Sequence, residues 1–301
     1  MIMSESRVVV VRSKSAVSAG GDFDKVKILR MLERGLCLLA GMSAGRDAWR
    51  TLFSERDRVG IKVNTIGGRK ISTRPETALS LAESLSEIGI SRKNIAVWDR
   101  TNRELREAGY RLNLDSTDYQ VMGTDTDGVG YEADITAHLN IGSRFSSIQS
   151  RFVTASVSLA ILKDHGLAGI TAGMKNYFGA VHNPNKYHDA NCNPYVAEVF
   201  DVPLIKTKHR LTILDAMLVQ FHRGPSFHPR WAEPFGGLIF SVDPVAADAF
   251  GWRVLEKLRA QKGLPSLKEE NREPRYLGTA ETMGLGTADP EKIRIIEDEV
   301  P

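Results

Sequence analysis

Basic and imidazole side chains gather in one stretch of this chain, residues 163–188. The stretch holds three lysines and three histidines, and Asp164 is its only acid. It follows an apolar run, residues 152–162, that is typical of a buried strand. A neutral imidazole can bind a metal or act as a base, and burial can shift the pKa of a lysine toward neutrality. We therefore expect chemistry where that strand ends.

Four side chains of this stretch form the predicted catalytic set. His165 is expected to be the acid/base, and Lys175 an electrostatic stabiliser or a covalent anchor. Lys163 and Asn176 are expected to complete the surroundings of the substrate. His188 is predicted to bind a metal or the substrate, with His165 as a second metal ligand. The alternative is that the histidines are solvated loop residues and that the lysine belongs to an ion pair.

The elements that must position these residues have the pattern of an α/β protein. Apolar strands are predicted at 59–63 and 95–98, and helical periodicity between residues 73 and 88 joins them. A crossover of this length implies parallel strands. Further strands are predicted at 8–11, 152–162, 211–214 and 238–241. We therefore expect a mostly parallel sheet flanked by helices, with ligands at the carboxyl ends of its strands.

The chain is long enough for two lobes. We predict an N-terminal α/β lobe over 1–150 and a second α/β lobe over 151–301, and the two can also form one domain. Within the first lobe, Thr73 and Glu76 have the spacing of a capping box at the start of a helix. Residues 260–301 have the composition of a loosely packed, polar C-terminal segment.

Polar side chains also follow other predicted strands. Asn64 and Arg69 belong to a glycine-bearing loop, Asp99 and Arg103 follow the strand at 95–98, and Asp215 ends an apolar run. At the carboxyl ends of parallel strands they would lie near one cleft, so we predict that these five residues bind substrate. Tight turns, helix caps and surface charge are the structural alternatives.

Composition narrows the classes of partner. A net charge of +3 suits a small anionic molecule, and without a basic cluster interleaved with aromatics it argues against nucleic acid. No apolar stretch reaches the length of a membrane span. Two cysteines cannot supply the four ligands that an iron–sulfur cluster normally needs. The start, MIMSESR, has no signal-peptide pattern, so a cytoplasmic location is the default. An exported mature form and a homo-oligomer both stay open.

Seven short motifs between residues 59 and 248 resemble the family called domain of unknown function 362, and the resemblance covers about residues 8 to 290. They are VGIKVN (59–64), Thr73-x-Pro75, IAVWD (95–99), KDH (163–165), MKNYFG (174–179), ILDAM (213–217) and SVDPVAAD (241–248). The combination is specific although each piece alone is common. Many members of this family are fused to ferredoxin-like modules or carry export signals, and neither pattern is found in this sequence.

In the order of its parts the chain is also similar, more distantly, to nickel-pincer lactate racemases. The spacing of His165, Lys175 and His188 carries this resemblance. It implies an acid/base role for His165, a cofactor tether at Lys175 and a metal ligand at His188. A Gly-Thr-His-Arg turn of those enzymes aligns with residues 100–103, where Asn102 replaces the histidine. This replacement argues against two-base racemisation of lactate, and it leaves nickel as a cofactor by analogy alone.

Together these features predict an enzyme, an isomerase or an oxidoreductase, that acts on a small anionic substrate. The expected step is proton or hydride transfer beside a carboxylate, with a divalent metal as an optional participant. The alternative is a non-catalytic carrier or assembly protein for a metal or an anionic cofactor. Catalysis predicts that His165, Lys175 and His188 converge in one cleft, whereas a carrier predicts an open groove with no oriented base.

Overall fold

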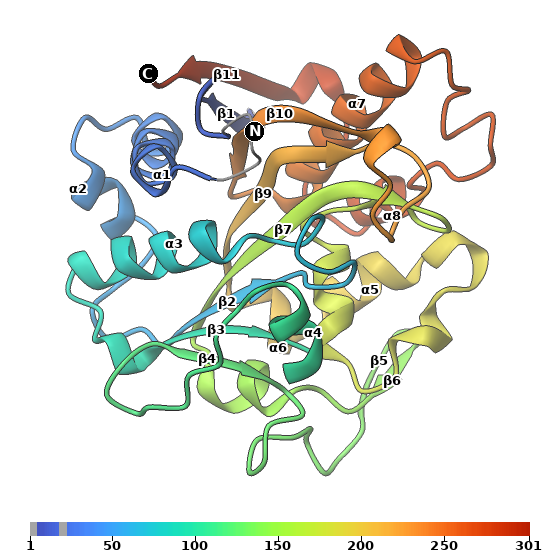
Figure 1. The fold of residues 1–301 in the computed structure, drawn as a ribbon. Helices are drawn as coiled ribbons and strands as arrows, with labels where there is room; N and C mark the ends of the chain where they lie inside the picture. Colours follow the sequence, from blue (N-terminus) through green and yellow to red (C-terminus); the bar gives the residue numbers. More distant parts are fainter. Residues whose placement is uncertain (1–4, 18–22) are drawn as a thin grey trace.

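One mixed sheet dominates the computed structural model, which describes residues 5–17 and 23–301 (Figure 1). The prediction that the start of the chain has no signal-peptide pattern falls partly on residues 1–4, which lie outside the described residues. The strands are β1 (Ser6–Arg12), β2 (Val59–Val63), β3 (Ile95–Asp99), β4 (Gln120–Gly123), β5 (Thr136–His138), β6 (Ile141–Ser143), β7 (Ala155–His165), β8 (Gly169–Thr171), β9 (His209–Gln220), β10 (Ala232–Ser241) and β11 (Ile293–Glu299). Strands β5 and β6 form a separate two-stranded sheet.

The large sheet has nine strands in the order β11-β1-β10-β9-β7-β2-β3-β4, and β8 pairs with β7. Five of its strand pairs are parallel, including the run from β9 through β7, β2 and β3 to β4. The pairs β1–β10, β10–β9 and β7–β8 are antiparallel. The predicted α/β fold with a mostly parallel sheet is confirmed. Strands from both sides of residue 150 share this sheet, and the predicted division into lobes stays a prediction.

Helices cover both faces of the sheet (Figure 1). They are α1 (Lys25–Ala40), α2 (Gly45–Arg50), α3 (Pro75–Glu87), α4 (Asn102–Glu107), α5 (Tyr195–Asp201), α6 (Pro203–Lys206), α7 (Pro244–Gln261) and α8 (Tyr276–Thr282). Helices α1 to α4 supply one hydrophobic core, and α5 to α8 supply the other. Among the described helices, none has the length and hydrophobicity that crossing a membrane requires.

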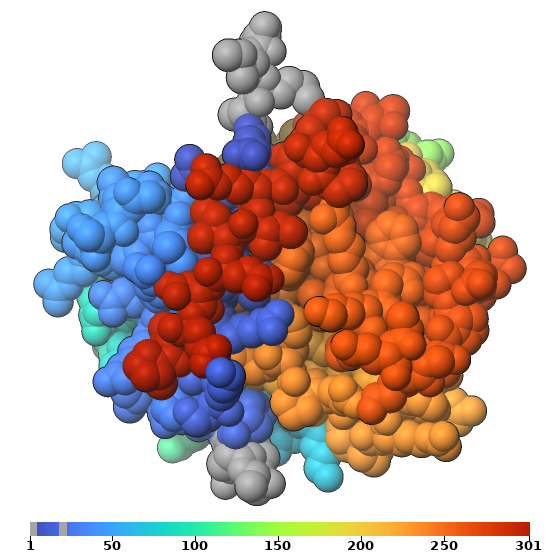
Figure 2. Space-filling view, turned by 90° about the horizontal axis from the view of Figure 1, so that it is seen from above, coloured from blue at the N-terminus to red at the C-terminus, as the bar shows by residue number. Residues whose placement is uncertain are grey.

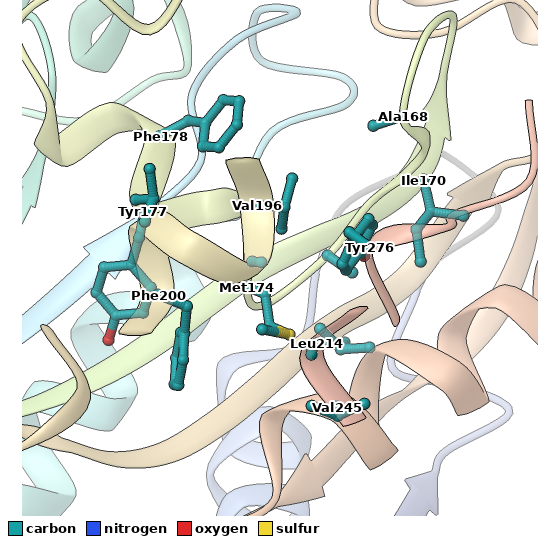
Figure 3. Packing of buried hydrophobic residues seen from close by; sticks show 14 of the residues in the cluster. Ala168, Ile170, Met174, Tyr177, Phe178, Val196, Phe200, Leu214, Val245 and Tyr276 are labelled. Atoms are coloured by element: carbon teal, nitrogen blue, oxygen red, sulfur yellow. The ribbon is translucent and has the colours of Figure 1, made fainter. Parts of the chain in front are cut away.

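Alternate side chains of the inner strands point into opposite hydrophobic cores. In β1, Val9 and Val11 face the core of α1, while Val8 and Val10 face the core of α7. A strand covered on both faces is apolar at every position, which explains the unbroken valine run. Aromatic residues pack together in the core that α5 to α8 supply. There Tyr177 meets Phe200 edge-on, with ring centroids 5.7 Å apart (Figure 3).

The predicted end of the strand at 152–162 and the predicted loose packing of the C-terminal segment are wrong. Strand β7 continues to His165, so Lys163 and His165 belong to a strand, because pairing with β8 extends the ladder past residue 162. The C-terminal segment is not loosely packed. Strand β11 pairs with β1 along its whole length, and Tyr276 of α8 is fully buried. In Figure 2 the red C-terminal segment runs across the surface beside the blue N-terminal residues.

The predicted capping box at Thr73 is also wrong. The residue before the first turn of α3 is Arg74, which makes no side-chain cap. The hydroxyl of Thr73 instead donates to the carbonyl of Leu159 in β7, 3.0 Å away, and accepts from the backbone N–H of Asn64. This residue therefore ties the loop after β2 to the centre of the sheet rather than capping the helix.

A buried ion pair fixes the start of α3 to strand β9. The Asp215 carboxylate accepts from Arg74 Nη1 at 2.9 Å, and both side chains are almost inaccessible to solvent. We expect Asp215→Ala to lower the free energy of unfolding by about 3–5 kcal/mol, because it leaves a buried guanidinium without its partner. Urea unfolding measures this.

The matched control is Glu83→Ala, which removes an exposed ion pair with Lys25. That change should cost less than about 1 kcal/mol. Equal losses in the two variants would contradict the structural role of the buried pair.

Candidate functional site

A cavity of about 220 Å³ lies beside the carboxyl ends of β2, β3 and β7. Seven of the ten residues predicted to act in catalysis or binding line it. They are Asn64, Asp99, Lys163, His165, Lys175, Asn176 and His188. Distant parts of the sequence therefore meet where ligands usually bind in parallel α/β sheets.

The carboxylate of Asp99 is fully engaged by the protein. Its Oδ1 accepts from Lys62 Nζ at 2.6 Å and from the backbone N–H of Arg100 at 2.8 Å. Its Oδ2 accepts from the backbone N–H and the hydroxyl of Thr65. A methyl group at Gly179 would lie 2.7 Å from Lys62 Nζ, so glycine lets the backbone approach this pair. Among the described residues that line the cavity, Asp99 is the single carboxylate.

Lys163 is buried at the base of the cavity without an acidic partner among the described residues. Its Nζ donates to the carbonyl of Ile71 at 3.0 Å and also to the carbonyl of Ile66. These contacts stabilise an ammonium less than a carboxylate would. Burial therefore lowers the pKa of Lys163 to about 7, and the charge of Asp99 offsets only part of this.

Lys175 is the second buried lysine of the cavity. Its Nζ lies 3.2 Å from Nε2 of His188 and 4.0 Å from the ring centre of Phe178. Within the described part of the chain it has no salt bridge to an acid, and the thiol of Cys192 lies beside it. Burial lowers the pKa of Lys175 to about 8. The amine can therefore lose its proton near neutral pH.

Backbone contacts fix the orientation of both imidazoles. Nδ1 of His165 accepts from the backbone N–H groups of Leu167 and Ala168, at 3.2 and 3.1 Å. Nδ1 of His188 donates to the carbonyl of Pro184 at 3.0 Å. In the neutral rings, Nε2 of His165 therefore carries a proton, and Nε2 of His188 carries a lone pair. The two rings stack with their centroids 5.7 Å apart.

Both imidazoles are held in the neutral form. Burial lowers the pKa of His165 well below its usual range, and the nearby charge of Lys175 lowers it further. The pKa of His188 is also lowered, first by burial and then by Lys175. A proton donor and a proton acceptor thus coexist in the cavity at neutral pH, because neither ring protonates readily.

The segment that carries Lys175 and Asn176 is clamped against the sheet. Asp248 of α7, itself fully buried, accepts from the backbone N–H groups of Gly173 and Met174, at 2.7 and 3.1 Å. Asn176 donates to the carbonyl of Lys62 and accepts from its Nζ, so its amide is spent within the protein. These contacts fix the backbone around Lys175, and the catalytic role predicted for Asn176 stays a prediction.

Three predicted substrate-binding residues lie outside the cavity. Arg69 is exposed and lies against Gly109, and Arg103 forms an exposed pair with Glu107 at 3.5 Å on the surface of α4. The carboxylate of Asp215 is already held by Arg74 in a buried ion pair. β9 continues past Asp215 to Gln220, and Arg103 lies on α4, so neither residue occupies the strand end at which it was predicted.

Sequence reasoning missed two charged residues of the cavity. Lys62 and Arg100 both line it. A lysine inside the otherwise apolar strand of residues 59–63 was an available indication, since a buried charge needs a partner. Arg100 directly follows Asp99 and could not be separated from ordinary helix-flanking charge.

The predicted metal role of His165 and His188 stays a prediction. Within residues 5–17 and 23–301, no three His, Cys, Asp or Glu side chains are grouped so that they could hold a metal ion. Two imidazoles are fewer ligands than protein zinc sites use. In addition, Nε2 of His188 already contacts Lys175. These residues alone do not fit a divalent metal.

Comparisons with known proteins address the family of this chain. No curated protein sequence matches it. The crystal structure of a protein from Thermotoga maritima is similar in fold, with a TM-score of 0.43 and 11% identity over 80% of this chain. The chain spans 60% of the length of that protein. The resemblance to lactate racemases stays a prediction. The family described as Domain of unknown function (DUF362) matches residues 59–253, and this chain belongs to it.

Proposed function

We propose that the cavity binds a small organic anion and that the protein is an enzyme acting on it by proton transfer. The observation that carries this proposal is the excess of buried positive charge. Lys163 and Lys175 have no acidic partner among the described residues, and Asp99 is already engaged by Lys62. Buried charges in proteins are normally paired. A bound anion would supply the missing countercharge.

The oriented imidazoles support catalysis rather than binding alone. His165 presents an N–H group, and His188 holds a lone pair against the Lys175 amine. A donor and an acceptor in one cavity are what proton transfer beside a carboxylate or carbonyl requires. Hydride transfer would need a redox cofactor in addition, so proton transfer is the step that these side chains could perform themselves.

The alternative function is a carrier or assembly protein for an anionic cofactor. A carrier would bind its anion through the same cations, but the fixed tautomers of His165 and His188 would have no role in it. A carrier would bind and release its anion unchanged, whereas an enzyme would exchange or move a proton of its substrate. Proton exchange into deuterated water, followed by NMR of candidate oxo and hydroxy acids, separates the two functions.

Removing one cation should weaken the binding of an anion such as oxalate. We expect Lys163→Met to lower the affinity about ten- to a hundredfold, because a hydrogen bond to a charged group contributes about 1.5–3 kcal/mol. Isothermal titration calorimetry measures the change.

Lys208→Met is the matched control. Lys208 is a half-buried lysine that contacts only the carbonyls of Gln149 and Ser150, away from the cavity. Its replacement should leave oxalate binding unchanged. Equal affinities for wild type and Lys163→Met would count against the proposal.

Binding should also depend on pH in a defined direction. The pKa of Lys163 is about 7 in the free protein, and a bound anion would raise it. Below that pH the amine already carries its proton, so affinity stays constant. Above it, each binding event takes up a proton and affinity falls by up to about tenfold per pH unit. Calorimetry at about pH 8 in two buffers of different ionisation enthalpy measures the uptake. Proton release on binding would contradict the assignment.

A further inference from the structure

We propose that Lys175 forms an imine with the carbonyl carbon of a small 2-oxo acid bound in this cavity. The inference rests on the proposed function, since the cavity must first bind the anionic end of that molecule. It adds the class of substrate, an oxo acid, and a covalent step at one named nitrogen.

The surroundings of Lys175 suit a nucleophile better than a fixed charge. Its Nζ lies in a buried site beside the ring of Phe178, and no acid among the described residues holds it as an ammonium. The lowered pKa gives a useful fraction of neutral amine near pH 8. Desolvation of this kind is a recognised way to activate a lysine toward carbonyl carbons.

His188 is oriented to receive the proton that the amine must lose. Its Nδ1 is committed to the carbonyl of Pro184, so the lone pair of Nε2 points to Lys175 Nζ at 3.2 Å. Attack on a carbonyl makes the nitrogen strongly acidic, and a lone pair at hydrogen-bond distance can take the proton directly.

His165 supplies the complementary group. Its Nδ1 is occupied by two backbone N–H groups, so Nε2–H is the free end of the ring, stacked next to His188. This N–H can donate to the carbonyl oxygen as negative charge develops there. Lys163, His165 and Lys175 line the same cavity. A molecule whose carboxylate binds Lys163 can therefore present an adjacent carbonyl to Lys175 and His165.

The step balances without an oxidant or a reductant. The C–N bond forms between Lys175 Nζ and the carbonyl carbon, and a proton of the amine passes to His188 while Nε2–H of His165 donates a hydrogen bond to the developing alkoxide. His188 returns that proton to the oxygen, which gives a neutral carbinolamine. The carbinolamine expels its hydroxyl group, and the last proton of the nitrogen passes through His188 to the leaving hydroxide, which departs as water. One amine and one carbonyl give one imine and one water.

Reductive trapping tests the proposal on the full-length protein. Glyoxylate and sodium cyanoborohydride convert an imine into a stable carboxymethyl amine, which intact mass measurement and peptide mapping locate. We expect one rapid adduct per chain, on Lys175, and its loss in Lys175→Arg. His188→Asn should slow trapping by about a hundredfold, the usual size of a general-base contribution, while oxalate binding persists. Lys208→Met should be trapped like wild type.

The outcomes separate this inference from the proposed function. Adducts spread evenly over surface lysines, or trapping that persists in Lys175→Arg, would overturn the imine. Oxalate binding without a Lys175 adduct would also overturn it but would leave the anion site standing. A wild-type protein that binds neither oxalate nor glyoxylate would overturn both.

Discussion

The ion pair between Lys62 and Asp99 is the contact on which the rest of the site depends. It joins β2 to β3 at 2.6 Å and uses the single carboxylate among the described residues that line the cavity. The contact leaves Lys163 and Lys175 without an acidic partner among the described residues. Lys163 and Lys175 therefore carry lowered pKa values, and the two imidazoles near them stay neutral. One satisfied pair thus accounts for the unsatisfied charge on which the proposed anion site rests.

Much of the fold follows from local patterns in the sequence. The strand at 59–63, the crossover helix and the strand at 95–99 are apolar runs separated by a helical period, so they were predicted closely. β4 was missed because it has only four residues, and β11 was missed because an edge strand mostly open to solvent has a mixed composition. β11 forms by pairing with β1, and the sequence of 260–301 alone does not indicate which strand it pairs with.

The site was predicted in part for a similar reason. The histidines and lysines of 163–188 were predicted from their residue types, since imidazoles and glycines next to a buried strand are unusual in a purely structural segment. Side-chain direction was not predictable: Asp215 lies within β9 and Arg103 within α4, and both form ion pairs outside the cavity. The tautomers of His165 and His188 depend on the carbonyl of Pro184 and on two backbone N–H groups, whose positions only the fold determines.

NMR titration of the lysine side chains tests the central claim most directly, that the buried lysines lack a countercharge until an anion binds. With lysines labelled with ¹³C at Cε, the resonance assigned through Lys163→Met should titrate at about pH 7 in the free protein. It should move to a clearly higher pKa when oxalate is added. An ordinary lysine pKa in the free protein, or a titration that oxalate leaves unchanged, would contradict the account.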